Sequence, residues 1–463
     1  MALFLLSIAG IFLIGSVGEL IFQRTNIPDV IWLILAGIML GPVAGLITRE
    51  LLGSIAPYFA ALTLVIVLFD GGSALKLQEL RSAASRSTIL ALCTFGTAII
   101  GISLLGAALG LLSERLHEWF EIARFLPAEW GVMHGVLLAT ILAGSSSIII
   151  MPAMAAAKVD PKISNLVNLE SAVTDALCVV GTAAVVDIML GSVEGSGGPL
   201  LALLSSFGIG AGIGIGAGLI WLLFLKLLKN AQHAYPFTLS ALLILYVVID
   251  NAGGSAAFGI LSVALILGNA KLIGKTIGLS DDVELDLGVR GFHAQMAFIV
   301  KSLFFVFIGA MLGPPWGGVI LGVVLGIALF LLRIPAVSLA LKGSGLSGSE
   351  SGLVHVSMPR GMAAGVLATL PFTQGVPGTQ ELPVMVFTAV FVSILIFAVG
   401  FPLAKSRLAK AVASEAPTSP PAASAGELDV AQAIDDMTGP LDESQPAPPT
   451  LSGPPLPPVD KES

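Results

Sequence analysis

Apolar residues occupy long blocks of this chain, and charged residues gather in the short segments between the blocks. Thirteen blocks lie between residues 3 and 405, and each is about long enough to cross a bilayer as a helix of roughly 20 residues. The predicted helices span 3–22, 28–47, 56–75, 88–112, 132–157, 166–190, 199–225, 236–250, 256–270, 294–313, 316–341, 352–371 and 384–404. The pattern predicts an all-α polytopic membrane protein with about 13 transmembrane helices.

The composition leads to the same class. Hydrophobic residues make up 56% of the 463 residues and charged residues only 11%, which excludes an ordinary soluble globular protein. Between two predicted helices, the segment 113–129 mixes charged and aromatic residues with helical spacing. This pattern suits a helix that lies on the outer membrane surface, but an ordinary amphipathic loop helix is the stronger interpretation. We therefore expect an integral protein of the cell (inner) membrane.

The chain changes character near Val412. Residues 412–463 are rich in Pro, Ala and Ser and carry nine acids and one base, whereas residues 1–411 carry 21 acids and 21 bases. A segment of this kind buries too little apolar surface to order itself. We expect a transmembrane domain over 1–411 and a disordered acidic tail over 412–463, so the net charge of the chain says nothing about its substrate.

Lys and Arg are distributed unevenly among the connections between the predicted helices. If the N-terminus lies outside, sixteen of the 22 basic residues, Arg333 among them, fall in inward connections and three fall in outward ones. Cytoplasmic loops of membrane proteins carry such an excess. The distribution predicts an N-terminus outside and a C-terminal tail in the cytoplasm, and it favours the count of thirteen.

Three charges lie deep inside the apolar blocks: Asp175 in the sixth predicted helix, Lys301 in the tenth and Arg360 in the twelfth. A charge near the bilayer centre costs roughly 2.5 to 3.5 kcal/mol on insertion scales, so it persists where it meets water, a partner or a moving ion. Lys301 is too deep to reach the interface easily, and we expect it to pair with an acid on a facing helix. The three charges point to transport.

Two of the predicted helices contain residues that weaken a helix. The fifth holds Gly144 and the hydroxyl run Ser145–Ser147, followed by Pro152, and the twelfth holds Pro359–Gly361. If helices 1–6 and 8–13 are two halves joined by the seventh, these breaks occupy equivalent places in two inverted six-helix repeats. Interrupted helices in corresponding positions of inverted halves indicate an ion site near the midplane.

Asp175 is the residue we expect to carry the ion. A carboxylate in a partly dehydrated cavity can bind H+ and a cation in competition. Hard cations prefer oxygen ligands, and Thr174, Ser146 and Ser171 could add hydroxyls beside carbonyls of the broken fifth helix. The predicted site for Na+ or K+ therefore comprises Asp175, Thr174, Ser146 and Ser171, and one acid exchanging one proton for one monovalent cation predicts electroneutral exchange.

Five motifs, in order and on the expected helices, resemble the cation:proton antiporter superfamily, which includes the sodium/proton exchangers. The resemblance covers about residues 10 to 405. Its motifs are Pro28–Ile31 through Gly37–Pro42, Leu68–Gly72, Glu170–Asp175, Lys301–Gly309 and Pro359–Gly361.

The resemblance implies a homodimer in which a static dimerisation domain supports a mobile core of crossed, broken helices. The core would carry Na+ (or K+, Li+) and H+ across the membrane by alternating access, for pH and cation homeostasis. By resemblance, Glu170 and Arg360 form a structural ion pair between the sixth and twelfth helices. No cofactor, no enzymatic activity and no nucleic-acid partner is expected, and membrane lipid surrounds the protein.

The chain departs from the superfamily at informative positions. Electroneutral sodium/proton exchangers usually show Asn-Asp where this chain has Thr174-Asp175, and Thr-Asp-Pro where it has Ser145–Ser147. The serine run is more similar to the potassium-efflux branch, which keeps a K+/H+ antiporter as the alternative. Electrogenic relatives show two adjacent acids with a lysine like Lys301. A lysine that pairs with Asp175 in the empty site would add a second proton, but a single acid favours electroneutral exchange.

Other functional classes are weaker. A channel would need a continuous hydrated path, and a lone acid with a competing base is more typical of a carrier. An intramembrane protease would use Ser145 or Ser146 with His293 or His355, but neither histidine has a clear orienting acid at a matched depth. A regulatory protein without transport is weaker still.

Overall fold

The computed structural model describes residues 2–25, 28–47, 49–74, 77, 84–120, 125–191, 198–227, 234–276, 278, 287–314 and 316–415. All regular elements in these ranges are helices. The chain divides into a unit over Met1–Ala409 and a unit over Lys410–Ser463. The second unit is described only to residue 415, so the predicted disorder of the tail falls largely outside the described residues, and the predicted boundary at 411/412 stays a prediction.

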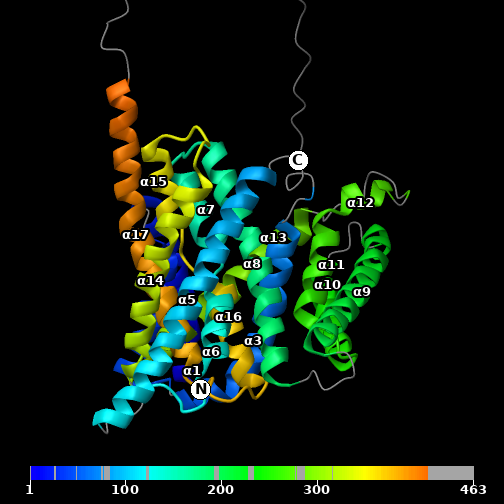
Figure 1. Cartoon of the computed structure of the whole chain (residues 1–463). Helices are drawn as coiled ribbons and strands as arrows, with labels where there is room; N and C mark the ends of the chain where they lie inside the picture. Colours follow the sequence, from blue (N-terminus) through cyan, green and yellow to red (C-terminus); the bar gives the residue numbers. More distant parts are fainter. Residues whose placement is uncertain are drawn as a thin grey trace, which may run out of the picture. The chain divides into compact units, whose positions relative to one another are not determined.

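The helices follow the apolar blocks closely. Each of the thirteen predicted segments coincides with one helix or with a helix that is interrupted inside it (Figure 1). The elements are α1 (Ala2–Thr25), α2 (Asp29–Ile38), the π-helix η1 (Met39–Val43), α3 (Arg49–Ala74), α5 (Ala84–Phe120), α6 (Val132–Leu142), α7 (Ser147–Ala156), α8 (Pro161–Met189), α9 (Gly198–Leu227), α10 (Ala234–Asn251), α11 (Ala256–Gly268), α12 (Ala270–Thr276), α13 (Leu287–Met311), α14 (Trp316–Ala340), α15 (Gly348–Val356), α16 (Met362–Thr373) and α17 (Leu382–Glu415).

The protein is an integral membrane protein. Six helices in the described residues are long and apolar enough to cross a bilayer, or seven if the pair α11 and α12, bent by 79°, forms one span. Shorter apolar helices such as Asp29–Val43 and Met362–Thr373 accompany them. The count of thirteen spans and the inverted repeats stay predictions.

One boundary prediction was wrong. We expected 113–129 to form a helix of its own, in a loop or on the membrane surface, but residues 113–120 continue α5, which runs unbroken for 37 residues. The sequence there holds no proline that would stop the helix, and Arg115 bonds Glu118 one turn later at 3.3 Å. The end of α5 is therefore an amphipathic extension of the fourth predicted helix.

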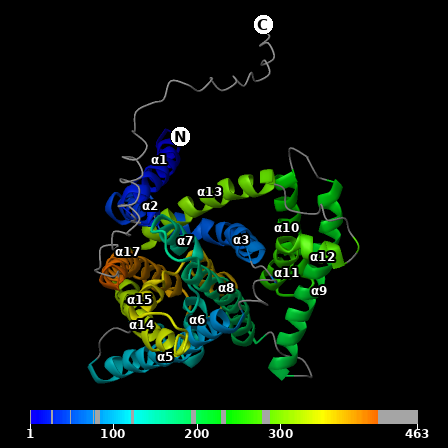
Figure 2. The ribbon, with the colours of Figure 1, turned by 90° about the horizontal axis from the view of Figure 1, so that it is seen from above.

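The helices pack in two groups, which Figure 2 shows side by side. One group contains α5–α8 and α14–α17, and the other contains α1–α3, α9–α11 and α13. Helices α3 and α11 contact α8 or α16 and so join the groups. In the second group α2 and α13 touch through glycines, because a Cβ atom on Gly309 would lie 2.9 Å from the Gly37 Cα atom. The two helices whose breaks were predicted from the sequence, α6/α7 and α15/α16, lie in the first group.

Candidate ion site at two crossed helix breaks

Two breaks meet inside the first helix group. The fifth predicted helix is divided into α6 and α7, and the twelfth into α15 and α16, so both predicted interruptions are confirmed. The backbone N–H of Ser146 in one break donates to the Pro359 carbonyl in the other at 2.8 Å. Unwound backbone at membrane depth is tolerated where protein or a water-filled cavity satisfies it. Each break thus supplies part of the other's hydrogen bonding.

Arg360 caps the end of α6. Its Nη1 donates to the Ala143 carbonyl at 3.1 Å and to the Gly144 carbonyl, and the side chain is buried. Its backbone N–H donates to Ser393 Oγ of α17 at 2.9 Å. Carbonyls at a helix C-terminus lack partners within the helix and carry partial negative charge, which a cation stabilises. The charge of Arg360 is therefore held by the backbone of the fifth predicted helix.

The hydroxyls of α8 hold the first break from the other side. Ser171 Oγ donates to the Ser145 carbonyl at 2.8 Å and accepts from the Ser147 N–H at 2.7 Å. Thr174 Oγ1 donates to the Ser171 carbonyl at 3.1 Å and accepts from the Ser145 N–H at 3.3 Å. Each hydroxyl oxygen retains one lone pair, since a hydroxyl has two acceptor sites. Both side chains therefore shape the break and keep capacity for another partner.

Asp175 lies against the same break. A Cβ atom on Gly144 would lie 3.1 Å from an Asp175 carboxylate oxygen, so glycine leaves room for the close approach. Asp175 is half-buried, whereas Ser171 and Thr174 are fully buried. Ser146 is buried too, with its side chain against Gly361 of the second break. The structure thus brings the four residues predicted to bind the cation to one place.

The predicted ion pair of Glu170 with Arg360 was wrong. Glu170 accepts from Arg333 of α14 through both carboxylate oxygens, at 2.6 and 2.9 Å. Arg333 had been placed in a cytoplasmic connection, yet it is 3% exposed and lies inside α14. The available signal was that residue 333 falls within the apolar block 316–341. This block therefore contains a buried charge, Arg333, that sequence reasoning had assigned to a loop.

Lys301 has an acid on a facing helix, as predicted, and the acid is Asp29. The Lys301 ammonium donates to Asp29 Oδ2 at 2.6 Å, which joins α13 to the start of α2. The side chains are 14% and 13% exposed. The alternative in which Lys301 pairs with Asp175 in the empty site is wrong for this structure, because Lys301 belongs to the second helix group and bonds Asp29 there.

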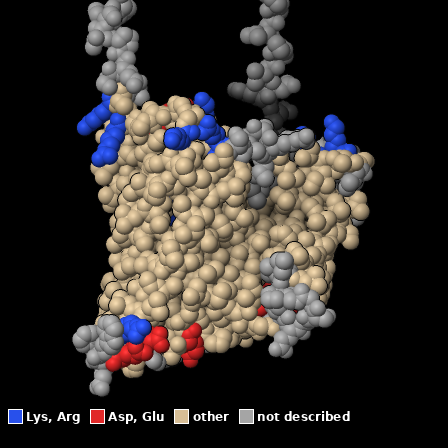
Figure 3. Space-filling view, viewed as in Figure 1, with Lys and Arg blue, Asp and Glu red and all other residues tan. Residues whose placement is uncertain are grey.

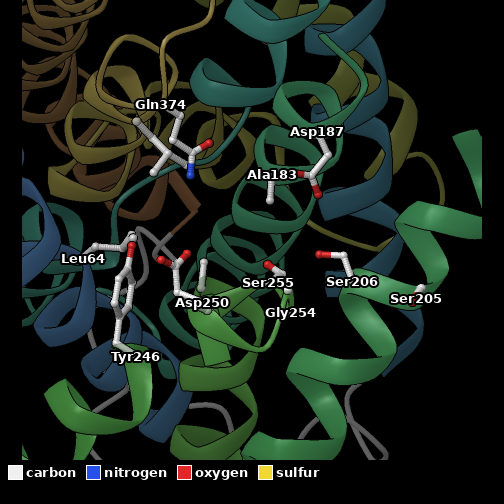
Figure 4. A pocket seen from close by; sticks show the side chains of 14 residues that line it. Leu64, Ala183, Asp187, Ser205, Ser206, Tyr246, Asp250, Gly254, Ser255 and Gln374 are labelled. Carbon is white, nitrogen blue, oxygen red and sulfur yellow. The ribbon is translucent and has the colours of Figure 1, made fainter. Parts of the chain in front are cut away.

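A cavity of about 400 Å³ opens between the two groups, beside the last turns of α8 and α10. Figure 4 shows Asp250 beside Tyr246 on one side and Asp187 near Ser206 on the other. Asp187 lies twelve positions after Asp175 on α8, about 18 Å along the helix axis. The cavity therefore lies on the carboxyl-terminal side of Asp175 along α8, and both of its carboxylates were missed by the sequence analysis.

His355, one of the two histidines that the intramembrane protease hypothesis requires as a base, makes its contacts away from Ser145 and Ser146. His355 Nδ1 lies 2.7 Å from the Ser351 carbonyl, and its Nε2 lies 3.2 Å from Ser338 Oγ. The His293 side chain lies outside the described residues. Among the described residues, no His bond reaches Ser145 or Ser146, and this arrangement gives no support to nucleophilic catalysis.

The sequence profile of the sodium/hydrogen exchanger family, transmembrane region, matches residues 8–405. The chain belongs to this family. A relative, the K(+)/H(+) antiporter NhaP2 of Shewanella sp. (strain MR-4), is 27% identical over 402 residues, which cover 84% of this chain and 64% of the relative. Na(+)/H(+) antiporter 1 of Methanocaldococcus jannaschii is 23% identical over 381 residues, covering 80% and 83%.

A solved structure shares the fold of this family member. The sodium proton antiporter MjNhaP1 from Methanocaldococcus jannaschii at pH 8 superposes with a TM-score of 0.65 at 20% identity, covering 88% of this chain and 98% of that chain. The likeness confirms the antiporter fold expected from the motifs. The chain spans 64% of the length of the NhaP2 relative, so the activity of the whole protein is argued below from its own residues.

Proposed function

We propose that the protein is a secondary active antiporter that exchanges a monovalent cation for H+ by alternating access, with Asp175 as the shared carrier. The observation that carries the proposal is the place of Asp175 at the break between α6 and α7, beside the hydroxyls of Thr174, Ser171 and Ser146. A half-buried carboxylate beside polar oxygens offers one charge for which a cation and a proton compete. The relatives, named as Na(+)/H(+) and K(+)/H(+) antiporters, support this reading.

The pairing of Lys301 favours electroneutral exchange. Its ammonium bonds the Asp29 carboxylate on α2, which supports a role for Lys301 apart from the exchange at Asp175. One carboxylate that releases one proton for each monovalent cation moves no net charge. We propose Na+ as the preferred ion and K+ as the alternative, and pH and cation homeostasis as the role.

The cavity lined by Asp187 and Asp250, which we call the acidic cavity, supports a route from the outside of the membrane to the ion site. Figure 3 shows Lys and Arg mostly on the face where α12, α15 and the end of α17 lie, with Asp and Glu mostly on the opposite face. Cytoplasmic faces of membrane proteins carry an excess of Lys and Arg. This distribution supports a cytoplasmic C-terminal tail, and it supports an opening of the acidic cavity, near Asp187, on the outer side of the membrane. We propose a homodimer in the cell inner membrane that works without a cofactor and catalyses no chemical reaction.

Reconstituted vesicles with a pH dye inside test the function. A pulse of Na+ or K+ should drive proton flux in the wild type, and Asp175→Asn should abolish it. Asp160→Asn is the matched control, because Asp160 caps the exposed start of α8 and accepts from the Lys162 N–H, and asparagine caps equally well. Flux that persists in Asp175→Asn would overturn the site, and no flux with either cation would overturn the function.

A further inference from the structure

Cys178 is a buried thiol that lies one helical turn from Asp175. It belongs to α8 and is 2% exposed. Residues three apart on a helix are neighbours on its surface, so the thiol and the Asp175 carboxylate lie on the same side of α8. A Cβ atom on Gly144 would lie 3.0 Å from Cys178 Sγ and 3.1 Å from Asp175 Oδ1. The sulfur and the carboxylate oxygen therefore border one point beside the Gly144 backbone, at the break between α6 and α7.

Oxygen atoms add to the surroundings of this point. The Thr174 carbonyl oxygen would lie 3.5 Å from the same Cβ position. The Ser145 side chain, next in the chain after Gly144, is 1% exposed, and its hydroxyl has no hydrogen-bond partner among the described residues. Buried polar atoms ordinarily have a partner, so this hydroxyl keeps its capacity to bind a ligand. The break thus offers a thiol, a carboxylate, a carbonyl and an unused hydroxyl within one small region.

The chemistry of the thiol separates it from the oxygens of the ion site. A free cysteine can serve as a small apolar side chain, but Cys178 has a carboxylate at its side rather than apolar groups alone. Thiolate ligands select soft cations such as Cu+, whereas hard cations prefer oxygen ligands. Cys178 is therefore suited to a cation other than the Na+ or K+ that we propose for Asp175.

We propose that Cys178 and Asp175 together bind a soft monovalent cation, Cu+ or Ag+, that enters along the path of the transported ion and stays bound. A bond from the metal to sulfur forms, the S–H bond breaks, and the proton leaves to water, so nothing is oxidised or reduced. A metal–thiolate bond is about 2.3 Å long for Zn2+. The sulfur lies 3.0 Å from the point beside Gly144, so a small rotation of the Cys178 side chain is enough to bind a metal there.

The site suits a cation that needs few ligands. Among the described residues, three or more His, Cys, Asp or Glu side chains nowhere gather closely enough to hold a metal ion, so the ligand set typical of Zn2+ is not found there. Cu+ and Ag+ accept two ligands, and their single charge equals that of the transported cation. A soft cation held by Cys178 occupies Asp175 and stops exchange. This arrest rests on the proposed antiport function, whereas the binding of the metal does not.

Silver retained by the detergent-solubilised full chain tests the site directly. The chain has two cysteines, so Cys93→Ser leaves Cys178 as its only thiol. The proteins are treated with AgNO3 in chloride-free buffer and washed with imidazole, which removes Ag+ from His and Met side chains. Cys93→Ser should retain one Ag+ per chain, and Cys93→Ser combined with Cys178→Ala should retain none. Equal retention by the two proteins, or none by Cys93→Ser, would overturn the site.

Competition tests whether the metal shares Asp175 with the transported ion. The nitrate salt of the cation that drives proton flux, Na+ or K+, should slow the uptake of Ag+ by Cys93→Ser, because it occupies the Asp175 carboxylate. Choline nitrate at the same concentration is the control for ionic strength and should leave the uptake unchanged. Uptake that neither salt slows, or that both slow equally, would overturn the shared site.

Transport gives the functional readout. In reconstituted vesicles, external AgNO3 should stop cation-driven proton flux in the wild type and in Cys93→Ser. Cys178→Ala, and Cys178→Ser as a second variant of nearly native size, should keep their flux in the presence of silver. Equal inhibition of the Cys178 variants, or continued flux in Cys93→Ser with one Ag+ bound, would overturn the arrest. Failure of the antiport function is seen separately, as an absence of flux before silver is added, and the retention of Ag+ then still decides the site.

Discussion

Arg333 and Glu170 form a bidentate ion pair at the centre of the first helix group. The guanidinium donates to both carboxylate oxygens, and its Nε and Nη2 also donate to the Val354 carbonyl at 3.1 and 3.0 Å. The contacts tie α8 and α14 to the last turn of α15, just before the second break. The pair therefore holds the helix that bears Asp175 to one half of a broken helix.

Removing one member of this pair should destabilise the protein strongly. Glu170→Ala or Arg333→Ala leaves a buried charge without a partner, which costs about 3 to 5 kcal/mol. The double substitution Glu170→Leu with Arg333→Met removes both charges and should recover most of that loss. Thermal melting in detergent measures the three variants.

A surface pair provides the control for this prediction. Arg115 and Glu118 bond at 3.3 Å with side chains 61% and 48% exposed, and exposed pairs contribute about 0 to 1 kcal/mol. Arg115→Ala should therefore melt close to the wild type. Wild-type melting in both buried single variants would show that Glu170 and Arg333 are not coupled in the membrane protein.

The Asp29–Lys301 pair should be dispensable for the charge balance of transport. If Lys301 only neutralises Asp29, then Asp29→Asn combined with Lys301→Gln should keep cation-driven proton flux insensitive to an imposed voltage. The single variants should melt lower, because each leaves one charge unpaired. Proton flux in vesicles clamped at two potentials measures the outcome, and a stoichiometry that changes in the double variant would assign a transported proton to Lys301.

The helix breaks could be predicted from sequence because local chemistry causes them. Gly144 with the serine run, and Pro359 with Gly361, weaken a helix wherever it packs, so their positions followed from residue type alone. The course of the other helices followed in the same way from the length of the apolar blocks. These features depend on neighbours along the chain, and the sequence displays those directly.

The partners of the buried charges could not be predicted in the same way. Glu170 meets Arg333 rather than Arg360 because the packing of the helices places Arg333 of α14 within reach of α8. Lys301 meets Asp29 because glycines let α2 and α13 approach closely. A crossing is set by packing between segments far apart in sequence. Arg333 was also misplaced because a charge near the end of an apolar block resembles the start of a loop, although α14 continues for seven residues beyond it.

The carboxylates of the acidic cavity should raise the rate of cation capture from outside. Asp187 and Asp250 line a cavity with low-dielectric walls, and such clefts concentrate ions of opposite charge. Replacing both with Asn should raise the KM for external cation by about tenfold at low ionic strength, the lower end of such focusing effects.

Salt dependence distinguishes this focusing from damage to the site. The maximal rate at saturating cation should stay near the wild-type value, and the difference in KM should shrink when an impermeant salt raises the ionic strength, because salt screens charges over about 10 Å at 0.1 M. Initial rates at graded external cation supply both quantities. A lowered maximal rate with an unchanged KM would remove Asp187 and Asp250 from the access route.

Arg360 should be needed for the shape of the ion site as well as for stability. Arg360→Gln removes the guanidinium that donates to the carbonyls at the end of α6. The buried Ala143 and Gly144 carbonyls then lose their donor, which should lower the free energy of unfolding by about 1 to 3 kcal/mol. Because the Gly144 backbone lies against Asp175, the variant should also lose cation-driven proton flux at temperatures where it is still folded. A double-mutant cycle of thermal melting with Arg360→Gln and Glu170→Ala gives the decisive comparison. The two losses of stability should be nearly additive if Arg333, and not Arg360, is the partner of Glu170. A large coupling between Glu170 and Arg360 would restore the pairing that the superfamily resemblance implied.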